Sequence, residues 1–322
     1  MANISDVANK AGVSINTVSR YLNNKGYISE KTRLKIQQAI DELNYIPNQV
    51  ARNLFKNKTG LIGLVIPDVK HPFFSTITAY IENELDTRNL KMILCNTANS
   101  SEKEKSYIKM LQQNKVDGII IGSHSIDIDY SNINAPIVSL DRYLDPKIPI
   151  VSADHEKGGR LAAHALIEAG CKNVLQIVGY SQVDSPSNKR YRSFEAEMKS
   201  YHIPCATYEL AWNQFDLASY IEVADEILTR YPDIDGIFAV DMVIVAMLRQ
   251  ALKRGIRVPQ ALKLVGYDGT YLSQMTCPSF PSVIQPYEEL AKKAVAILVE
   301  LMDKKEIDQM IYELDVHLTE EQ

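Results

Sequence analysis

The stretch Ile4–Asn23, ISDVANKAGVSINTVSRYLN, predicts two short amphipathic helices joined by a tight turn. Ala8, Gly12 and Val18 occur at the spacing of a helix-turn-helix. The small Ala8 lets the helices approach closely, Gly12 lets the backbone turn without a steric cost, and Val18 packs the second helix onto the first. A recognition helix inserts its N-terminal end into the DNA major groove, and the polar face of the second helix lies at that end. An ordinary helical hairpin is the alternative.

A third helix is predicted to complete this N-terminal domain, residues 1–46. It begins near Glu30 and carries Ile36, Ala39 and Leu43 at helical spacing, so that its apolar stripe closes a small core. Three polar residues are placed as N-caps of the three helices: Asn3, Ser14 and Ser29. The expected head is therefore all-α.

The charge distribution favours DNA binding by this head. Residues 1–58 hold nine basic and four acidic side chains, a net charge of +5. The other residues hold 26 basic and 36 acidic side chains, which gives −10 and an overall charge of −5. Such an asymmetry is typical of a phosphate-binding head on an acidic body that does not touch nucleic acid.

Composition excludes several other classes of protein. The chain has no run of 18 apolar residues and no charged-then-apolar leader, so neither a membrane span nor a signal peptide is expected. Its four cysteines are far apart without a C-x-x-C pair, which indicates single thiols in a reducing, cytoplasmic compartment. We found no phosphate-binding, dinucleotide-binding or hydrolase motif and no metal-ligand spacing. We therefore expect no enzyme, no cofactor and no metal site.

Residues 47–58 are predicted to form a short helix and a polar linker. Pro47 stands at a helix start, and about eight helix-compatible residues follow it. A helix of this length is marginal in isolation, so it should form only when something holds it. A plain interdomain linker is the alternative.

From residue 59 onward, apolar runs alternate with amphipathic stretches, which predicts a two-lobed α/β core of doubly wound parallel sheets. We expect one lobe at about 59–154 and 284–310, and the other at about 155–283 and 311–322. The predicted strands are Leu61–Pro67, Lys91–Asn96, Gly118–Gly122, Pro136–Leu140, Asn173–Val178, Gly236–Val240, Leu262–Val265 and Ile311–His317.

Polar side chains follow three of these strands. Ligands of open α/β sheets bind beyond the carboxyl ends of the strands, where Asp68, Asp141 and Asp268 are expected. Carboxylates that accept hydrogen bonds from hydroxyl groups, together with an arginine that donates, suit a small polyol. Phe73 and Trp212 could supply an apolar face for a sugar ring. An aspartate after a strand is also a common turn residue, so position alone does not decide its role.

The order of the head, the segment Tyr45–Leu54 and the core resembles the LacI/GalR family of transcriptional regulators. The resemblance covers essentially the whole chain and includes the motifs Ile66–Phe74, Val138–Arg142, Gly255–Pro259 and Leu264–Asp268. It implies that the hinge helices of two subunits pack in the DNA minor groove, where Asn48, Ala51 and Leu54 contact the operator and Leu54 wedges into a base step. It also implies a core similar to periplasmic sugar-binding proteins.

The head residues that are expected to contact DNA lie on the second predicted helix and around it. Asn16 can pair bidentately with adenine, Ile15 can contact a thymine methyl, and Tyr27 is placed to hold phosphate. The full predicted set is Ile4, Ser14, Ile15, Asn16, Thr17, Ser19, Arg20, Asn23, Tyr27, Ser29 and Thr32.

The resemblance also implies the residues that bind the effector. Asp268, Arg192 and Asp141 match family positions that contact it. Val240 departs from the family pattern, in which a polar residue often stands before Asp241, so Asp241 is a candidate as well. The full predicted set is Asp268, Arg192, Asp141, Trp212, Phe73, His71, Asp68 and Asp241.

These observations predict a cytoplasmic, homodimeric repressor of carbohydrate-utilisation genes. Its affinity for a pseudo-palindromic operator would be controlled by a small sugar or sugar phosphate bound between the lobes. The absence of a heptad repeat favours a dimer without a coiled-coil tetramer. Three alternatives remain: a regulator whose effector is a phosphorylated carrier protein, a solute-binding protein that does not bind DNA, and a hydrolase or kinase on this fold.

Overall fold

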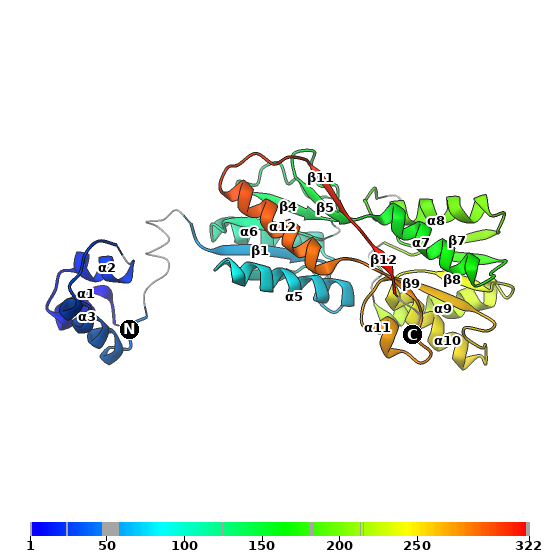
Figure 1. Cartoon of the computed structure of the whole chain (residues 1–322), viewed down its shortest axis with the longest axis horizontal. Coiled ribbons are helices and arrows are strands. Elements are labelled where there is room, and N and C mark those ends of the chain that lie inside the picture. Colours follow the sequence, from blue (N-terminus) through cyan, green and yellow to red (C-terminus); the bar gives the residue numbers. More distant parts are fainter. Residues whose placement is uncertain are drawn as a thin grey trace. The chain divides into compact units, whose positions relative to one another are not determined.

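The computed structural model describes residues 2–23, 25–46, 58–123, 125, 127–180, 183–212, 214 and 216–319 (Figure 1). The chain divides into two compact units, residues 1–59 and residues 60–322. Each unit has its own hydrophobic core.

The first unit is a three-helix head, as the sequence predicts. Asn3 forms a capping box with Asp6, and Ser14 and Ser29 each accept a hydrogen bond from the backbone N–H three residues on. Gly12 ends the first helix with a φ of +66°, a conformation that favours glycine. The helices are α1 (Ile4–Ala11), α2 (Ile15–Leu22) and α3 (Glu30–Glu42).

A small set of apolar side chains holds the head together. Val18 of α2 and Ile36 of α3 are fully buried at its centre. The buried cluster consists of Val7, Ala8, Ala11, Val18, Ile36, Ala39 and Tyr45. Ala8 and Val18 thus take the positions that the helix-turn-helix spacing predicts.

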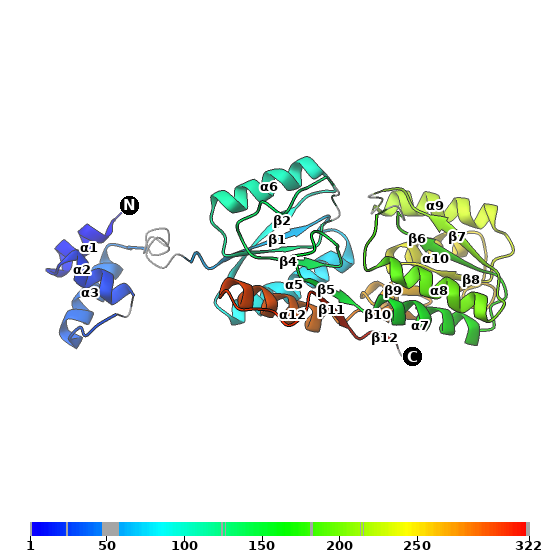
Figure 2. The same cartoon turned by 90° about the horizontal axis from the view of Figure 1, so that it is seen from above.

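The second unit begins with a six-stranded sheet, here called the first-lobe sheet. All of its neighbouring strands pair in parallel, in the order β11-β5-β4-β3-β1-β2. Helices α5 and α12 cover one face and α6 covers the other (Figure 2). The strands are β1 (Leu61–Ile66), β2 (Lys91–Asn96), β3 (Gly118–Ile121), β4 (Ile137–Leu140), β5 (Ile150–Ala153) and β11 (Ile311–Leu314), and the helices are α5 (Pro72–Thr87), α6 (Ser101–Gln113) and α12 (Tyr287–Met302).

The second-lobe sheet has the order β12-β10-β9-β8-β6-β7, with only the β10–β12 pair antiparallel. Helices α7 and α8 cover one face, and α9 and α10 cover the other. The strands are β6 (Val174–Val178), β7 (Cys205–Glu209), β8 (Gly236–Phe238), β9 (Lys263–Asp268), β10 (Ser282–Ile284) and β12 (His317–Leu318). The helices are α7 (His155–Glu168), α8 (Asn188–Ser200), α9 (Leu217–Arg230), α10 (Asp241–Lys253) and the short α11 (Leu272–Met275).

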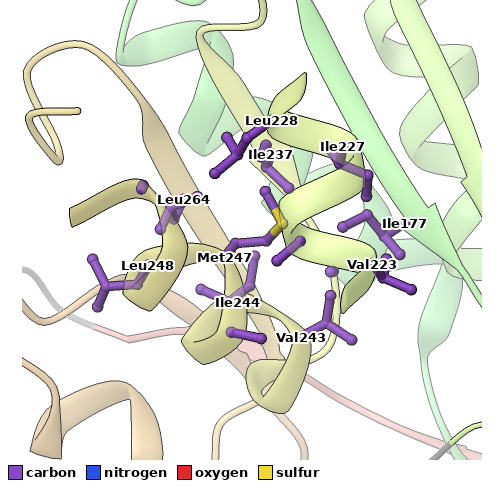
Figure 3. Packing of buried hydrophobic residues seen from close by; sticks show 14 of the residues in the cluster. Ile177, Val223, Ile227, Leu228, Ile237, Val243, Ile244, Met247, Leu248 and Leu264 are labelled. Carbon is purple, nitrogen blue, oxygen red and sulfur yellow. The ribbon is translucent and has the colours of Figure 1, made fainter. Parts of the chain in front are cut away.

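The core between this sheet and α9 and α10 is built from aliphatic side chains (Figure 3). Met247 and Ile244 of α10 lie among side chains of α9 and of the sheet, including Ile237 and Leu264. Full burial of such side chains contributes roughly 1.5–3 kcal/mol each relative to exposure. The long helices and apolar strands that the sequence predicts are thus held by packing on both faces of each sheet.

The predicted boundary of the second lobe is wrong at residues 311–314. Tyr312 of β11 pairs with Val151 of β5, so this strand belongs to the first-lobe sheet. The chain then crosses to the second lobe, where Leu318 of β12 pairs with Val283. Figure 1 shows this crossing segment in red. The sequence predicts one strand over Ile311–His317 because two short strands separated by a short break give the same apolar pattern as one longer strand.

Helices α7 and α8 approach so closely at Gly159 that a Cβ atom there would lie 2.1 Å from the carbonyl oxygen of Arg190 and 2.1 Å from Ser193 Oγ. Overpacking of this kind typically costs about 1–3 kcal/mol. Gly159→Ala should therefore lower the free energy of unfolding by about that amount in a urea titration followed by circular dichroism. The control is Gly179→Ala, because nothing lies within 4 Å of a Cβ at Gly179. Equal stability of the two variants would contradict the close approach.

Candidate functional site

The head exposes a group of side chains at and near the N-terminal end of α2. Ile15 is 47% exposed, and Asn16 and Arg20 are exposed beside it. Tyr27, in the connection to α3, is 93% exposed. An exposed isoleucine and tyrosine in a small domain of positive charge are suited to a contact with another molecule.

Other head residues predicted to contact DNA already make contacts within the domain. Ser14 Oγ lies 2.9 Å from Thr17 Oγ1, and Ser29 Oγ lies 2.9 Å from Thr32 Oγ1, at the two helix caps. Asn23 Nδ2 donates to the carbonyl oxygen of Ser19, and Ile4 packs against the core of the head. The predicted hinge residues Asn48, Ala51 and Leu54 lie outside the described residues. The DNA-binding set therefore stays a prediction.

The core unit contains a cavity of about 160 Å³ between the two lobes. Residues that follow β1, β3 and β4 line it from the first lobe, and residues that follow β6, β8 and β9 line it from the second. The carboxyl edges of both sheets therefore face the same cavity, which is where open α/β sheets bind ligands. We call it the interlobe cleft.

Asp268 and Arg190 form the charged centre of the cleft. Asp268 ends β9 with a φ of 103° and is 4% exposed, and its Oδ1 accepts a hydrogen bond of 2.9 Å from Gln285 Nε2. Arg190 is 8% exposed. Its guanidinium lies 4.4 Å from the ring centre of Tyr267 and 4.9 Å from that of Tyr191. Aromatic rings stabilise a cation in this position.

Two buried atoms of this centre have no protein partner among the described residues. They are Nε of Arg190, a donor, and Oε1 of Gln285, an acceptor. A buried polar atom without a partner costs free energy, and both side chains line the cleft. A ligand with hydroxyl groups would satisfy both, since a hydroxyl group donates and accepts.

A hydrogen-bonded chain links the two lobes behind the cleft. Asp141, after β4, has a φ of 57°, and its Oδ1 lies 2.7 Å from Nε2 of the buried His155. Nδ1 of His155 lies 2.7 Å from Tyr267 Oη. Because a carboxylate accepts hydrogen bonds, the neutral ring that satisfies both partners carries its proton on Nε2 and accepts from Tyr267 at Nδ1. Asp141 is thereby held at the cleft.

Aromatic rings and a neutral histidine complete the walls. Trp212 packs edge-on against Tyr180, with ring centres 5.5 Å apart, and Phe73 packs edge-on against Phe74 at 5.1 Å. Burial lowers the pKa of His71 to about 4, so this ring is neutral at pH 7. The cleft therefore combines flat apolar surfaces with a few fixed polar groups, which is usual for a small-molecule site.

The structure brings five of the eight predicted effector-binding residues into the lining of the cleft: Asp268, Asp141, Trp212, Phe73 and His71. The placement of Arg192 was wrong. Its side chain is 73% exposed and lies 3.8 Å from Asp184, whereas Arg190 lines the cleft. The reason is helical geometry: Arg190 precedes the buried Phe194 by four residues and shares its face, while Arg192 points elsewhere.

Asp68 and Asp241 also lie outside the lining. Asp68 Oδ1 accepts from the backbone N–H of Lys70, as in a turn. The buried carboxylate of Asp241 accepts from the backbone N–H and hydroxyl of Thr270 and from Ser282 Oγ, so its role is to join α10 to the loop after β9.

Two residues at the centre of the cleft, Arg190 and Gln285, were not predicted from the sequence. The four-residue spacing to Phe194 would have identified Arg190. Gln285 follows β10, a strand of three residues that was interpreted as a crossing between the lobes, so nothing marked it as the end of a strand.

Among the residues that the structure describes, no helix is long and apolar enough to cross a membrane. In the same part of the chain, no group of three or more His, Cys, Asp or Glu side chains is arranged to hold a metal ion.

The buried carboxyl groups should make stability depend on pH. Burial raises the pKa of Asp268 to about 6, and burial followed by repulsion from Asp268 raises the pKa of Asp241 to about 7, from an ordinary value of 3.8. The folded state thus holds these protons more tightly than the unfolded state. Their contribution to stability is complete below about pH 4 and is lost as the pH rises through about 7.

Asp268→Asn should remove the part of this loss that comes from Asp268 itself and from its repulsion of Asp241. Between pH 5 and pH 8 the variant should gain roughly 1–3 kcal/mol relative to the unaltered chain, at about 1.4 kcal/mol per pKa unit. Urea titrations at several pH values measure this, with the exposed Asp184→Asn as control. Parallel pH profiles for all three proteins would show that Asp268 is not held protonated by the fold.

Comparison with known proteins agrees with this architecture. Residues 3–48 match the family of bacterial regulatory proteins, lacI family, and residues 163–320 match the periplasmic binding protein-like domain. The sucrose operon repressor of Streptococcus mutans is 38% identical over 308 residues, which cover 95% of this chain and 94% of that protein. The ribose operon repressor of Halalkalibacterium halodurans is 37% identical over 320 residues, which cover 99% of this chain and 96% of that protein.

A solved structure of the Lac repressor dimer bound to operator and the anti-inducer ONPF is similar over nearly its whole length. It has a TM-score of 0.86 and 27% identity, and the match covers 99% of this chain and 98% of that chain. With the helix-turn-helix head, the two-lobed core and these similarities, the chain belongs to the lacI family of bacterial regulatory proteins.

Proposed function

We propose that this protein is a cytoplasmic, homodimeric repressor of carbohydrate-utilisation genes, and that a small sugar in the interlobe cleft controls its affinity for operator DNA. The observation that carries the proposal is the cleft itself. It presents a buried arginine, two carboxylates and aromatic rings on the same chain as a helix-turn-helix head. The protein acts by binding alone, without catalysis.

On the DNA side, two heads of a dimer would read a pseudo-palindromic operator. Ile15, Asn16 and Arg20 would contact base edges, and Tyr27 the phosphate backbone. The hinge residues Asn48, Ala51 and Leu54 would add contacts in the minor groove. The similar Lac repressor structure supports this arrangement, since it is a dimer bound to operator.

On the ligand side, the carboxylates of Asp268 and Asp141 would accept hydrogen bonds from sugar hydroxyl groups. Arg190 Nε would donate to an oxygen, and Trp212 and Phe73 would cover the apolar faces of the ring. The relatives named as sucrose and ribose operon repressors support a sugar as the ligand.

Control of DNA binding would follow from closure of the lobes. Three chain segments connect them, at 153–155, 284–287 and 314–317. A ligand that contacts both lobes stabilises the closed arrangement by its difference in affinity for the two states. Lys189 of α8 pairs with Glu313 of β11, which is an ion pair between the two lobes, and Lys157 of α7 pairs with Asp315 in the third connection.

The proposal is tested by a thermal-shift screen of the full chain against sugars, followed by fluorescence anisotropy with an operator selected from random duplex DNA. A sugar that raises the melting temperature should also change operator affinity. A sugar that binds and leaves operator affinity unchanged would count against control through the cleft.

Arg190→Met should weaken binding of such a sugar about 10- to 150-fold, because hydrogen bonds to a charged group contribute roughly 1.5–3 kcal/mol. Arg192→Met is the matched control two residues away and should leave sugar affinity unchanged. Calorimetric titration measures both, and the opposite result would restore Arg192 as the ligand-binding arginine.

Asn16→Ala should weaken operator binding about 5- to 150-fold, since one bidentate base contact contributes roughly 1–3 kcal/mol of discrimination. Binding to unrelated duplex DNA should change little. Gln38→Ala, an exposed side-chain deletion on α3, is the control. If Asn16→Ala weakens binding to both DNAs equally, Asn16 positions the backbone and does not read a base.

A further inference from the structure

The ionisable side chains of the cleft balance one another. Apart from tyrosines, those among the described lining residues are His71, Asp141, Arg142, Arg190 and Asp268. The two carboxylates cancel the two guanidinium groups, and His71 is neutral at pH 7 because its pKa is about 4. No lysine belongs to the described lining. Within two positions of a lining residue, the residues that the structure leaves undescribed are His124, Ser181, Gln182, Asn213 and Phe215, of which only His124 can carry a charge.

Arg190 already has several partners in the protein. Arg190 lies against the rings of Tyr267 and Tyr191, donates to Tyr191 Oη at 3.0 Å, and is attracted to the carboxylate of Asp268. Its Nε is buried without a protein partner among the described residues, so this atom can donate to an oxygen atom of a ligand.

The Nε of Arg142 is likewise buried without a protein partner among the described residues. The Arg142 side chain is buried and is attracted to Glu104 and Asp141. Glu104 is fully buried and accepts from Ser123 Oγ at 2.6 Å and from Tyr130 Oη at 2.5 Å. Glu104 does not belong to the described lining, and its attraction to Arg142 adds to that of Asp141, which does.

Some backbone N–H groups at the helix starts around the cleft already have an acceptor or are absent. The first N–H groups of α8, of Asn188, Lys189 and Arg190, donate to the carbonyl oxygens of Ser185, Pro186 and Ser187. Helix α5 begins with Pro72, which has no N–H. Helix α10 begins with the carboxyl group of Asp241 in its first turn. Helix N-termini bind anions through N–H groups that have no other acceptor.

We propose that the interlobe cleft is specific for an uncharged sugar and rejects its phosphate ester. This rests on the proposed function, that a sugar occupies the cleft. A phosphate monoester carries nearly two negative charges at pH 7, and burying these charges in a lining without net positive charge is costly. Hydroxyl groups fit the same cleft because they donate to Asp141 and Asp268 and accept from Arg190 Nε.

Matched pairs of ligands test this on the full chain. The probes are D-ribose and D-ribose 5-phosphate, D-fructose and D-fructose 6-phosphate, and sucrose and sucrose 6-phosphate, each titrated by calorimetry at constant ionic strength. The pair that binds should favour its neutral member at least about tenfold. A phosphate ester that binds more tightly than its neutral partner would overturn the proposal and leave the proposed function standing.

A second experiment uses inorganic phosphate and does not depend on finding a sugar that binds. Against sodium chloride of equal ionic strength, phosphate should not raise the melting temperature of the unaltered chain. Asp141→Asn/Asp268→Asn should gain such a response, because Arg190 and Arg142 lose carboxylates that balance them. Stabilisation of the unaltered chain by phosphate, abolished by Arg190→Met and kept by Arg192→Met, would overturn the proposal. Failure of the proposed function looks different: a sugar would bind, and operator affinity would not change.

Discussion

Both lobes place a charged cleft residue through contacts with the side chain of Tyr267. Its hydroxyl group bonds to His155, which in turn holds Asp141 of the first lobe. Its face supports the guanidinium of Arg190 in the second lobe. The ring fits only because α7 has a glycine beside it: a Cβ on Gly158 would lie 2.6 Å from Tyr267 Oη. A buried side chain with a polar tip and a flat face thus positions two opposite charges at once.

The charged groups of the cleft gain their character from burial. In water, the attraction between an arginine and a carboxylate is weak, and the pKa of an aspartate stays near 3.8. Between the two sheets the same groups influence one another strongly, because the surroundings screen charge poorly. Loss of hydration on burial is the main reason why the pKa values of Asp268 and Asp241 rise, and repulsion between the two groups adds to the rise at Asp241. The sum of the charges therefore matters more to a ligand than any single residue.

Most of the architecture could be predicted from the sequence, because long amphipathic helices and apolar strands have clear periods. The aspartates of the cleft were found since the carboxyl ends of parallel strands are predictable positions. Three short strands were not predicted, β5, β7 and β10, although the equally short β3, β4 and β8 were. Arg192 was chosen over Arg190 because a motif locates a helix but not the face that it turns inward, and that face depends on packing against Phe238 and its neighbours.

The strand β11 also sets the order in which the chain can fold during synthesis. The first lobe contains β1 to β5, yet its sheet is completed by β11, and one of its faces is covered by α12. A growing chain that has left the ribosome as far as Leu301 still lacks that edge strand. Every residue of the second lobe between β6 and β10 must emerge before the first lobe closes. The usual order of folding during synthesis, in which the N-terminal domain folds first, therefore does not apply within this unit. The exposed edge of β5 needs protection until residues 311–314 have been synthesised.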